Sequence, residues 1–206
     1  MTGIDFIFAI AVLIMSVVFH EVSHGYSAYF LGDPTAKYAG RLTLNPIKHL
    51  DFVGSLIVPA FTYLLGGFII GWAKPVPYNP YNLKNQKWGP AIVGASGPLA
   101  NFFLVAVFGL LIRFSSFLSF LPPAFWQIAI LIAFINLILG VFNLIPIPPL
   151  DGSKLLFALL PYQWRHVQDF LERYGFFILI FFIIFFLRLL LPAVLSLFKL
   201  ITGVAF

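Results

Sequence analysis

Residues 6–31 read FIFAIAVLIMSVVFHEVSHGYSAYFL, and this stretch decides what kind of protein the chain is. No charged residue occurs from position 6 to position 19, and the apolar pattern then continues to position 31 around two histidines and a glutamate. A helix of this length spans about 39 Å, which is enough to cross a bilayer. Ionisable groups within a spanning helix are costly, so they indicate a functional site.

The two histidines, His20 and His24, are four residues apart and therefore lie on one face of the helix. With Glu21 between them they form an H-E-x-x-H pattern, in which two imidazoles hold a zinc ion and the glutamate takes a proton from water. The same pattern occurs by chance in soluble helices, but histidine and glutamate are rare in spanning ones. The alternative is a structural cluster of polar side chains, or a path for protons or metal ions.

The composition excludes a water-soluble protein. Of the 206 residues, 61% are hydrophobic and only 9% are charged, whereas a soluble domain carries roughly 25% charged residues. This predicts an all-α polytopic membrane protein with about five to six hydrophobic segments, in which residues 1–206 form a single domain within the lipid bilayer. The net charge of +5 comes from scattered lysines and arginines, so no nucleic-acid partner is expected. Because cysteine is absent, any metal site must use His, Asp or Glu.

Further apolar stretches follow the first one, at residues 52–70, 91–112, 124–145 and 176–191. Pro59 and the pair Gly66-Gly67 interrupt the stretch at 52–70. A short strand is predicted at 38–44, and an amphipathic segment at the membrane surface over 162–174. Residues 192–206 are also apolar, and the sequence leaves open whether they cross the membrane.

The basic residues gather in three loops and predict the orientation of the chain. The loops hold Lys37, Arg41 and Lys48; Lys74, Lys84 and Lys87; and Lys154, Arg165 and Arg173. The positive-inside rule places all three in the cytoplasm, whereas a full crossing by 52–70 would put the second loop outside. We therefore expect a re-entrant segment: a half-helix at 52–65, a turn at Gly66-Gly67 and an extended, β-like return at 68–77. Extended chain within a membrane must be shielded or line a wet cavity, so it is expected beside the metal site.

A catalytic zinc ion needs a third protein ligand, and Asp151 is the best candidate. In the predicted topology, the first helix and the helix at 124–145 both run toward the cytoplasm, so their ends bring Asp151 near the histidines. The alternative is that Asp151 only caps the helix that follows it. His49 is a rival ligand near the membrane surface. Three other side chains are expected to be solvated: His166, Asp169 and Glu172.

Two asparagines could either support the site or simply hydrogen-bond between helices. Asn143 lies nearer to the proline-rich break before Asp151, so it is the better candidate for the site. For Asn101 the sequence leaves both roles open.

Four motifs together resemble the site-2 protease family of intramembrane zinc metalloproteases. They are His20-Glu21-x-x-His24, GWAKPVP at 71–77, GPLAN at 97–101 and NLIPIPPLDG at 143–152. The resemblance covers most of 6–160. It implies that His20, His24 and Asp151 hold one Zn²⁺ per chain, that Glu21 is the catalytic acid and base, and that Asn143 supports the substrate or the oxyanion. It also implies a minimal form of the family, without the PDZ or CBS domain that many members carry.

The activity implied by this resemblance is that of an intramembrane zinc endopeptidase. Such an enzyme hydrolyses peptide bonds in or near the transmembrane segment of membrane-anchored substrate proteins, in regulated intramembrane proteolysis. A catalytic core is expected at about 6–160 with C-terminal helices at 161–206, in the cell membrane and with the active site toward the cytoplasmic side. The alternative function is a membrane metal carrier or a pseudoprotease scaffold. The sequence gives neither the substrate nor the oligomeric state.

Overall fold

The fold consists of helices joined by extended loops, as described by a computed structural model that covers residues 3–51, 53–58, 61, 74–118 and 120–204. The α-helices are α1 (Gly3–Phe30), α2 (Thr35–Tyr38), α4 (Gly89–Arg113), α5 (Pro123–Asn143), α6 (Gly152–Leu159) and α7 (Arg165–Thr202). Short 3-10 or π-helical turns occupy Pro46–His49, Val53–Ile57, Pro80–Asn82, Ser115–Leu118 and Tyr162–Trp164. No strand occurs in the described ranges, which confirms the predicted all-α class.

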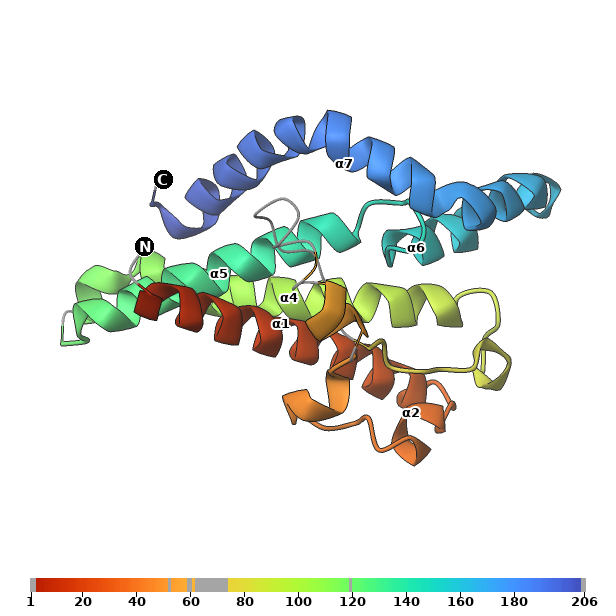
Figure 1. Ribbon diagram of the computed structural model, residues 1–206, viewed down its shortest axis with the longest axis horizontal. Coiled ribbons are helices and arrows are strands. Elements are labelled where there is room, and N and C mark those ends of the chain that lie inside the picture. The colour runs from red at the N-terminus through yellow and green to blue at the C-terminus, as the bar shows by residue number, and fades with distance from the viewer. Residues whose placement is uncertain (1–2, 52, 59–60, 62–73, 119, 205–206) are drawn as a thin grey trace.

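Helices α1, α4 and α5 lie side by side along the long axis and form the core of the bundle (Figure 1). Ala129 and Ala133 of α5 are fully buried, and side chains of this size let helices approach closely in lipid. Larger side chains fill the space between α4, α5 and the last part of α7: Val105, Ile112, Leu137, Val194 and Phe198. The last part of α7 is thus packed onto the core.

Among the described residues, three helices are long and apolar enough to cross a membrane: Ile7–Phe30, Gly89–Arg113 and Pro123–Asn143. The bent helix α7 brings the number to four if it counts as one span. Only 28%, 33% and 28% of the apolar stretches of these three helices, in chain order, are buried inside the structure. Most of their surface therefore faces outward, where lipid covers it. The protein is therefore a multi-pass membrane protein, while the predicted count of five to six hydrophobic segments is not confirmed.

Helix α7 joins the segments that the sequence treated separately after residue 162. The sequence predicted a surface segment at 162–174 and a span at 176–191 and left the course of 192–206 open. In the structure one helix runs from Arg165 to Thr202. Its two parts meet at 73°, and the resulting arch is visible above the bundle in Figure 1. Pro192 explains the bend, because proline has no amide hydrogen for the helical bond and its ring crowds the preceding turn.

The long connection from α1 to α4 also departs from the sequence prediction. The strand predicted at 38–44 is wrong, because Tyr38 ends α2 and Gly40 follows with a φ of +65°, which turns the chain. The predicted half-helix at 52–65 and its turn at Gly66-Gly67 lie largely outside the described residues. Of the predicted extended return, residues 74–77 are described and have no regular secondary structure, so the β-like element is not confirmed.

Asp33 fastens the end of α1 to the segment that leads into α4. Its buried carboxylate accepts hydrogen bonds from the backbone N–H of Asn79 at 2.6 Å, from the side chain of Asn82 at 2.9 Å and from the backbone N–H of Thr35. Burial raises the pKa of this carboxyl, but the bonds from Thr35, Asn82 and Asn79 lower it by more, so its pKa lies below the ordinary value. The charge stabilises the folded protein above the unfolded pKa of about 3.9, and this contribution is lost as the pH falls through the folded value.

Asp33→Ala is expected to lower the stability of the purified protein by at least about 2 kcal/mol, because hydrogen bonds to a charged acceptor each contribute roughly 1.5–3 kcal/mol. Thermal unfolding in detergent, followed by circular dichroism, measures the loss. Asp169→Ala removes an exposed carboxylate from α7 and is the control, with an unchanged midpoint. Equal midpoints for the two variants would show that Asp33 does not anchor the loop.

Candidate metal centre

Three side chains from distant parts of the sequence meet inside the bundle. His20 and His24 lie one turn apart on α1, and Asp151 lies directly before α6. Because α1 and α5 run in the same direction (Figure 1), the chain leaving α5 returns to the part of α1 that carries the histidines. The Asp151 Oδ2 atom lies 3.0 Å from His20 Nε2 and 3.1 Å from His24 Nε2, and the two Nε2 atoms are 3.0 Å apart. All three residues are buried.

A chain of hydrogen bonds places a proton on the Nδ1 atom of the His20 ring. Asn136 donates its amide N–H to the backbone carbonyl of Ile132, so its Oδ1 atom is the acceptor for the amide of Asn101. The Oδ1 atom of Asn101 must then accept from His20, whose Nδ1 atom lies 2.6 Å away. The proton of the neutral ring is therefore on Nδ1, and Nε2 presents a bare lone pair.

The His24 ring is held in the same way. Its Nδ1 atom lies 2.6 Å from the backbone carbonyl oxygen of Val93, which can only accept. Two bare Nε2 lone pairs and a carboxylate oxygen therefore converge, all within 3.1 Å of one another. Three acceptors at such distances repel one another, and a cation between them removes the repulsion.

Zinc fits this donor set. Zn²⁺ binds imidazole nitrogen and carboxylate oxygen at about 2.0–2.2 Å in a tetrahedron, whose ligand atoms lie about 3.3 Å apart; the three atoms here are 3.0–3.1 Å apart. Histidines that donate their second N–H to an oxygen acceptor are typical of zinc sites. Three protein ligands leave a fourth position open, as catalytic zinc requires.

Helix α4 can approach the two imidazoles because residue 97 is glycine. A β-carbon at this position would lie 2.5 Å from His24 Nε2 and 2.6 Å from His20 Nε2, closer than nonbonded atoms can pack. Val93 and Asn101 lie four residues to either side of Gly97, so one face of α4 holds both histidine rings.

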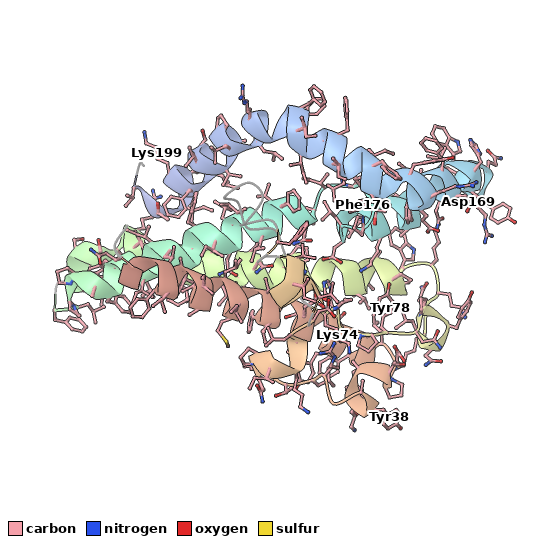
Figure 2. The ribbon with its side chains drawn as sticks, viewed as in Figure 1. Tyr38, Lys74, Tyr78, Asp169, Phe176 and Lys199 are labelled. Atoms are coloured by element: carbon pink, nitrogen blue, oxygen red, sulfur yellow. The ribbon has the colours of Figure 1, made fainter. Side chains whose placement is uncertain are left out.

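Glu21 lies beside the histidines and lines a cavity of about 200 Å³. Its Oε2 atom accepts the backbone N–H of Val76 at 2.8 Å, from the extended segment that Lys74 and Tyr78 mark in Figure 2. The cavity is therefore bounded by α1 on one side and by this segment on another. All five residues that the sequence assigned to the site line it: His20, Glu21, His24, Asn143 and Asp151.

Lys154, one turn into α6, also reaches this cavity. Its ammonium lies 2.9 Å from Asp151 Oδ1 and 5.6 Å from the centre of the Tyr78 ring. Burial lowers the pKa of the ammonium, but Asp151, Tyr78 and Glu21 together raise it by more, so the pKa lies above its ordinary value and the side chain stays charged. Lys154 thus holds one carboxylate oxygen of Asp151 and leaves the other facing the histidines.

The alternatives that the sequence left open have different outcomes. The Asp151 side chain makes no capping hydrogen bond to α6. His49 is buried away from the cavity, with its Nε2 2.8 Å from the Thr43 carbonyl oxygen. Asn143 lines the cavity, although its amide also donates to the carbonyl of Leu139 one turn back. Three other titratable side chains are exposed: His166, Asp169 and Glu172.

Three supporting residues were missed or left undecided by the sequence analysis. Asn101 does bond between helices, but it also orients His20. Gly97 and Lys154 were not assigned any role at the site. For Gly97 and Asn101 the sequence did contain a signal. Their four-residue spacing matches that of His20 and His24, as expected for two helix faces that pack against each other. Nothing comparable marked Lys154.

Comparison with known proteins identifies a matching family and several similar proteins. The model for peptidase family M50 matches residues 120–186. YwhC of Bacillus subtilis is 38% identical over 174 residues, which cover 82% of this chain and 76% of that protein. Rip2 of Mycolicibacterium smegmatis is 33% identical over 85% of this chain and 66% of its own length, and MJ0611 of Methanocaldococcus jannaschii is 33% identical over 78% of each. All three carry names that assign them provisionally to the zinc metalloproteases. No solved structure gives a significant match.

Gly97→Ala is expected to abolish zinc retention, because the new methyl group would occupy the space of both imidazoles. Metal analysis of the purified variant measures the effect. Gly109→Ala is the matched control in the same helix, since its methyl group would press on Ile201 of α7, about 18 Å along α4 from the site. A Gly97→Ala protein with a full complement of zinc would contradict the packing described above.

Asn101→Leu is expected to weaken zinc affinity by about 10–100-fold, the usual effect of removing the hydrogen-bond partner of a ligating histidine. Competition with a coloured chelator measures the affinity. Asn143→Leu is the comparison, because Asn143 makes no hydrogen bond to the three ligand side chains and its loss should leave the affinity unchanged. Equal affinities for both variants would mean that Asn101 does not orient His20.

Proposed function

Because the chain belongs to peptidase family M50, the site-2 protease family of membrane zinc metalloproteases, we propose that it hydrolyses peptide bonds in or near the transmembrane segments of membrane-anchored proteins. His20, His24 and Asp151 hold the zinc ion, one per chain. The observation that carries this proposal is the convergence of two imidazole nitrogens and a carboxylate oxygen, inside a membrane bundle, on a cavity that Glu21 also lines.

The chemistry divides between the metal and two side chains. Zinc, when bound, acidifies water and polarises a peptide carbonyl. Glu21 takes the proton from the attacking water and returns it to the leaving amine. Its position supports this role, because Val76 occupies Oε2 while no described residue donates to Oε1. Asn143 donates one amide hydrogen to the carbonyl oxygen of Leu139, and its second amide hydrogen is available to the substrate oxygen.

The substrate must present an unwound peptide, since the carbonyls of a helix are hydrogen-bonded and shielded. The extended segment beside Glu21 offers an edge for such a strand. Few of its backbone N–H groups are available: Pro75 and Pro77 have none, and the N–H of Val76 already donates to Glu21. Arg41 also donates to the carbonyl oxygens of Lys74 and Pro75. Pairing with the substrate would therefore use mainly the carbonyl oxygens of Val76 and Pro77.

We also infer that the protein lies in the cell membrane with its site toward the cytoplasm. The segments between α1 and α4 carry Lys37, Lys84 and Lys87, while the other end of α4 has Arg113 in its last turn and no basic residue in the turn Ser115–Leu118. His24 lies six residues before the end of α1, so water has only about 9 Å of helix to pass. Residues 1–206 then act as a single domain, since α7 packs on α4 and α5.

Glu21→Gln is expected to keep its zinc and to lose at least about 100-fold in cleavage rate, because general base catalysis contributes that much or more. The measurement uses purified protein in detergent, a model single-span substrate and metal analysis of the same sample. Glu172→Gln changes the one other glutamate of the chain, which is exposed on α7, and should cleave at the parent rate.

The same purified proteins distinguish the proposed peptidase from a metal carrier or an inactive scaffold. Zinc flux into proteoliposomes without any cleavage would favour the carrier, and bound zinc with neither flux nor cleavage would favour the scaffold. A Glu21→Gln protein that cleaves as fast as its parent would remove the proposed base.

A further inference from the structure

A second cavity, of about 280 Å³, lies at the end of the bundle where three segments meet. Lys87 contributes from the loop before α4, Phe157 and Leu160 from the end of α6, and Arg165 from the start of α7. This cavity shares no lining residue with the one that contains the candidate metal centre. Nothing in the proposed peptidase chemistry uses it.

The cavity is positively charged. Lys87 and Arg165 line it, whereas no aspartate or glutamate does. Within the described residues neither cation forms an ion pair with a carboxylate, and each instead lies near an aromatic ring, of Trp88 and Tyr162 respectively. Two cations at one cavity with no acid among its lining residues favour an anionic ligand with several acceptor oxygens, such as a phosphate.

The surroundings of the two cations are those of a membrane surface. Lys87 precedes the first residue of the spanning helix α4 by two positions, so the cavity lies at the depth where that helix leaves the membrane. Tyr162 and Trp164 also line the cavity and expose 83% and 52% of their surface, as aromatic residues do at the level of lipid headgroups. Phe157 and Leu160 provide an apolar wall on the side of α6.

We propose that this cavity binds the phosphate of an anionic phospholipid headgroup. Lys87 and Arg165 bind the phosphate oxygens, the two aromatic rings lie at headgroup level, and the apolar wall lies against the glycerol and the first part of the acyl chains. Basic pockets at helix ends on the membrane surface have the chemistry that such headgroups require. The site is independent of the metal centre, so its test uses lipid binding and not cleavage.

The test compares ligands on the full chain in a nonionic detergent by native mass spectrometry. The probes are dihexanoyl phosphatidylglycerol, dihexanoyl phosphatidylcholine and inorganic phosphate. Saturable binding of one phosphatidylglycerol, at least about tenfold tighter than phosphatidylcholine, is expected. Equal binding of the two lipids would overturn the proposal. Inorganic phosphate that binds as tightly as phosphatidylglycerol would show that the cavity recognises free phosphate and not a lipid headgroup.

A pair of double variants tests the residues. K87Q/R165Q is expected to weaken phosphatidylglycerol binding about 25-fold, since each cation near an anionic lipid accounts for roughly a fivefold change. K48Q/R173Q removes two exposed cations elsewhere and changes the net charge equally, so it should bind like the parent. An equal loss in both variants would mean that only the overall charge attracts the lipid. Zinc content and elution volume confirm that each variant is folded.

Discussion

The constraint on which the structure depends is the meeting of three acceptor atoms that repel one another unless a cation lies between them. The protons that could relieve the repulsion are held on the far sides of the rings, where Asn101 and the Val93 carbonyl accept them. Burial removes the water that would otherwise solvate the lone pairs and the carboxylate. A site of this kind is prepared for a metal ion by its hydrogen bonds, and the fold must be stable enough to hold the three groups together.

Helix α4 provides most of that support without contributing a ligand. Its carbonyl at Val93 and its amide at Asn101 orient one imidazole each, and Gly97 between them allows the close approach. Behind this face, Asn101 bonds to Asn136 of α5, which bonds to Ser16 of α1. The three core helices are therefore joined by a single polar network that ends at the site, and hydrogen bonds of this kind are a means by which helices associate in lipid.

Sequence reasoning anticipated the arrangement of the helices where a local pattern limits the choices. The polar H-E-x-x-H residues in an apolar helix predict a metal site, and the basic loops predict that the ends of α1 and α5 meet. It failed where distant contacts decide the structure. The predicted strand at 38–44 is replaced by α2 and a turn. The course of residues 192–206, which the sequence left open, is a continuation of α7 whose last turns pack on α4 and α5. The interhelical role of Asn101 could be foreseen, but its hold on His20 could not.

The sequence by itself determined the membrane environment, the two histidines of α1 and the candidate aspartate, because hydropathy and residue spacing act locally along the chain. Only the tertiary structure decided that the Asp151 carboxylate lies 3.0 Å from His20, which nitrogen of each ring carries the proton, and that Gly97 leaves the room they need. These properties arise between helices that are far apart in sequence. Their packing in three dimensions, and not any local preference, fixes the distances on which coordination depends.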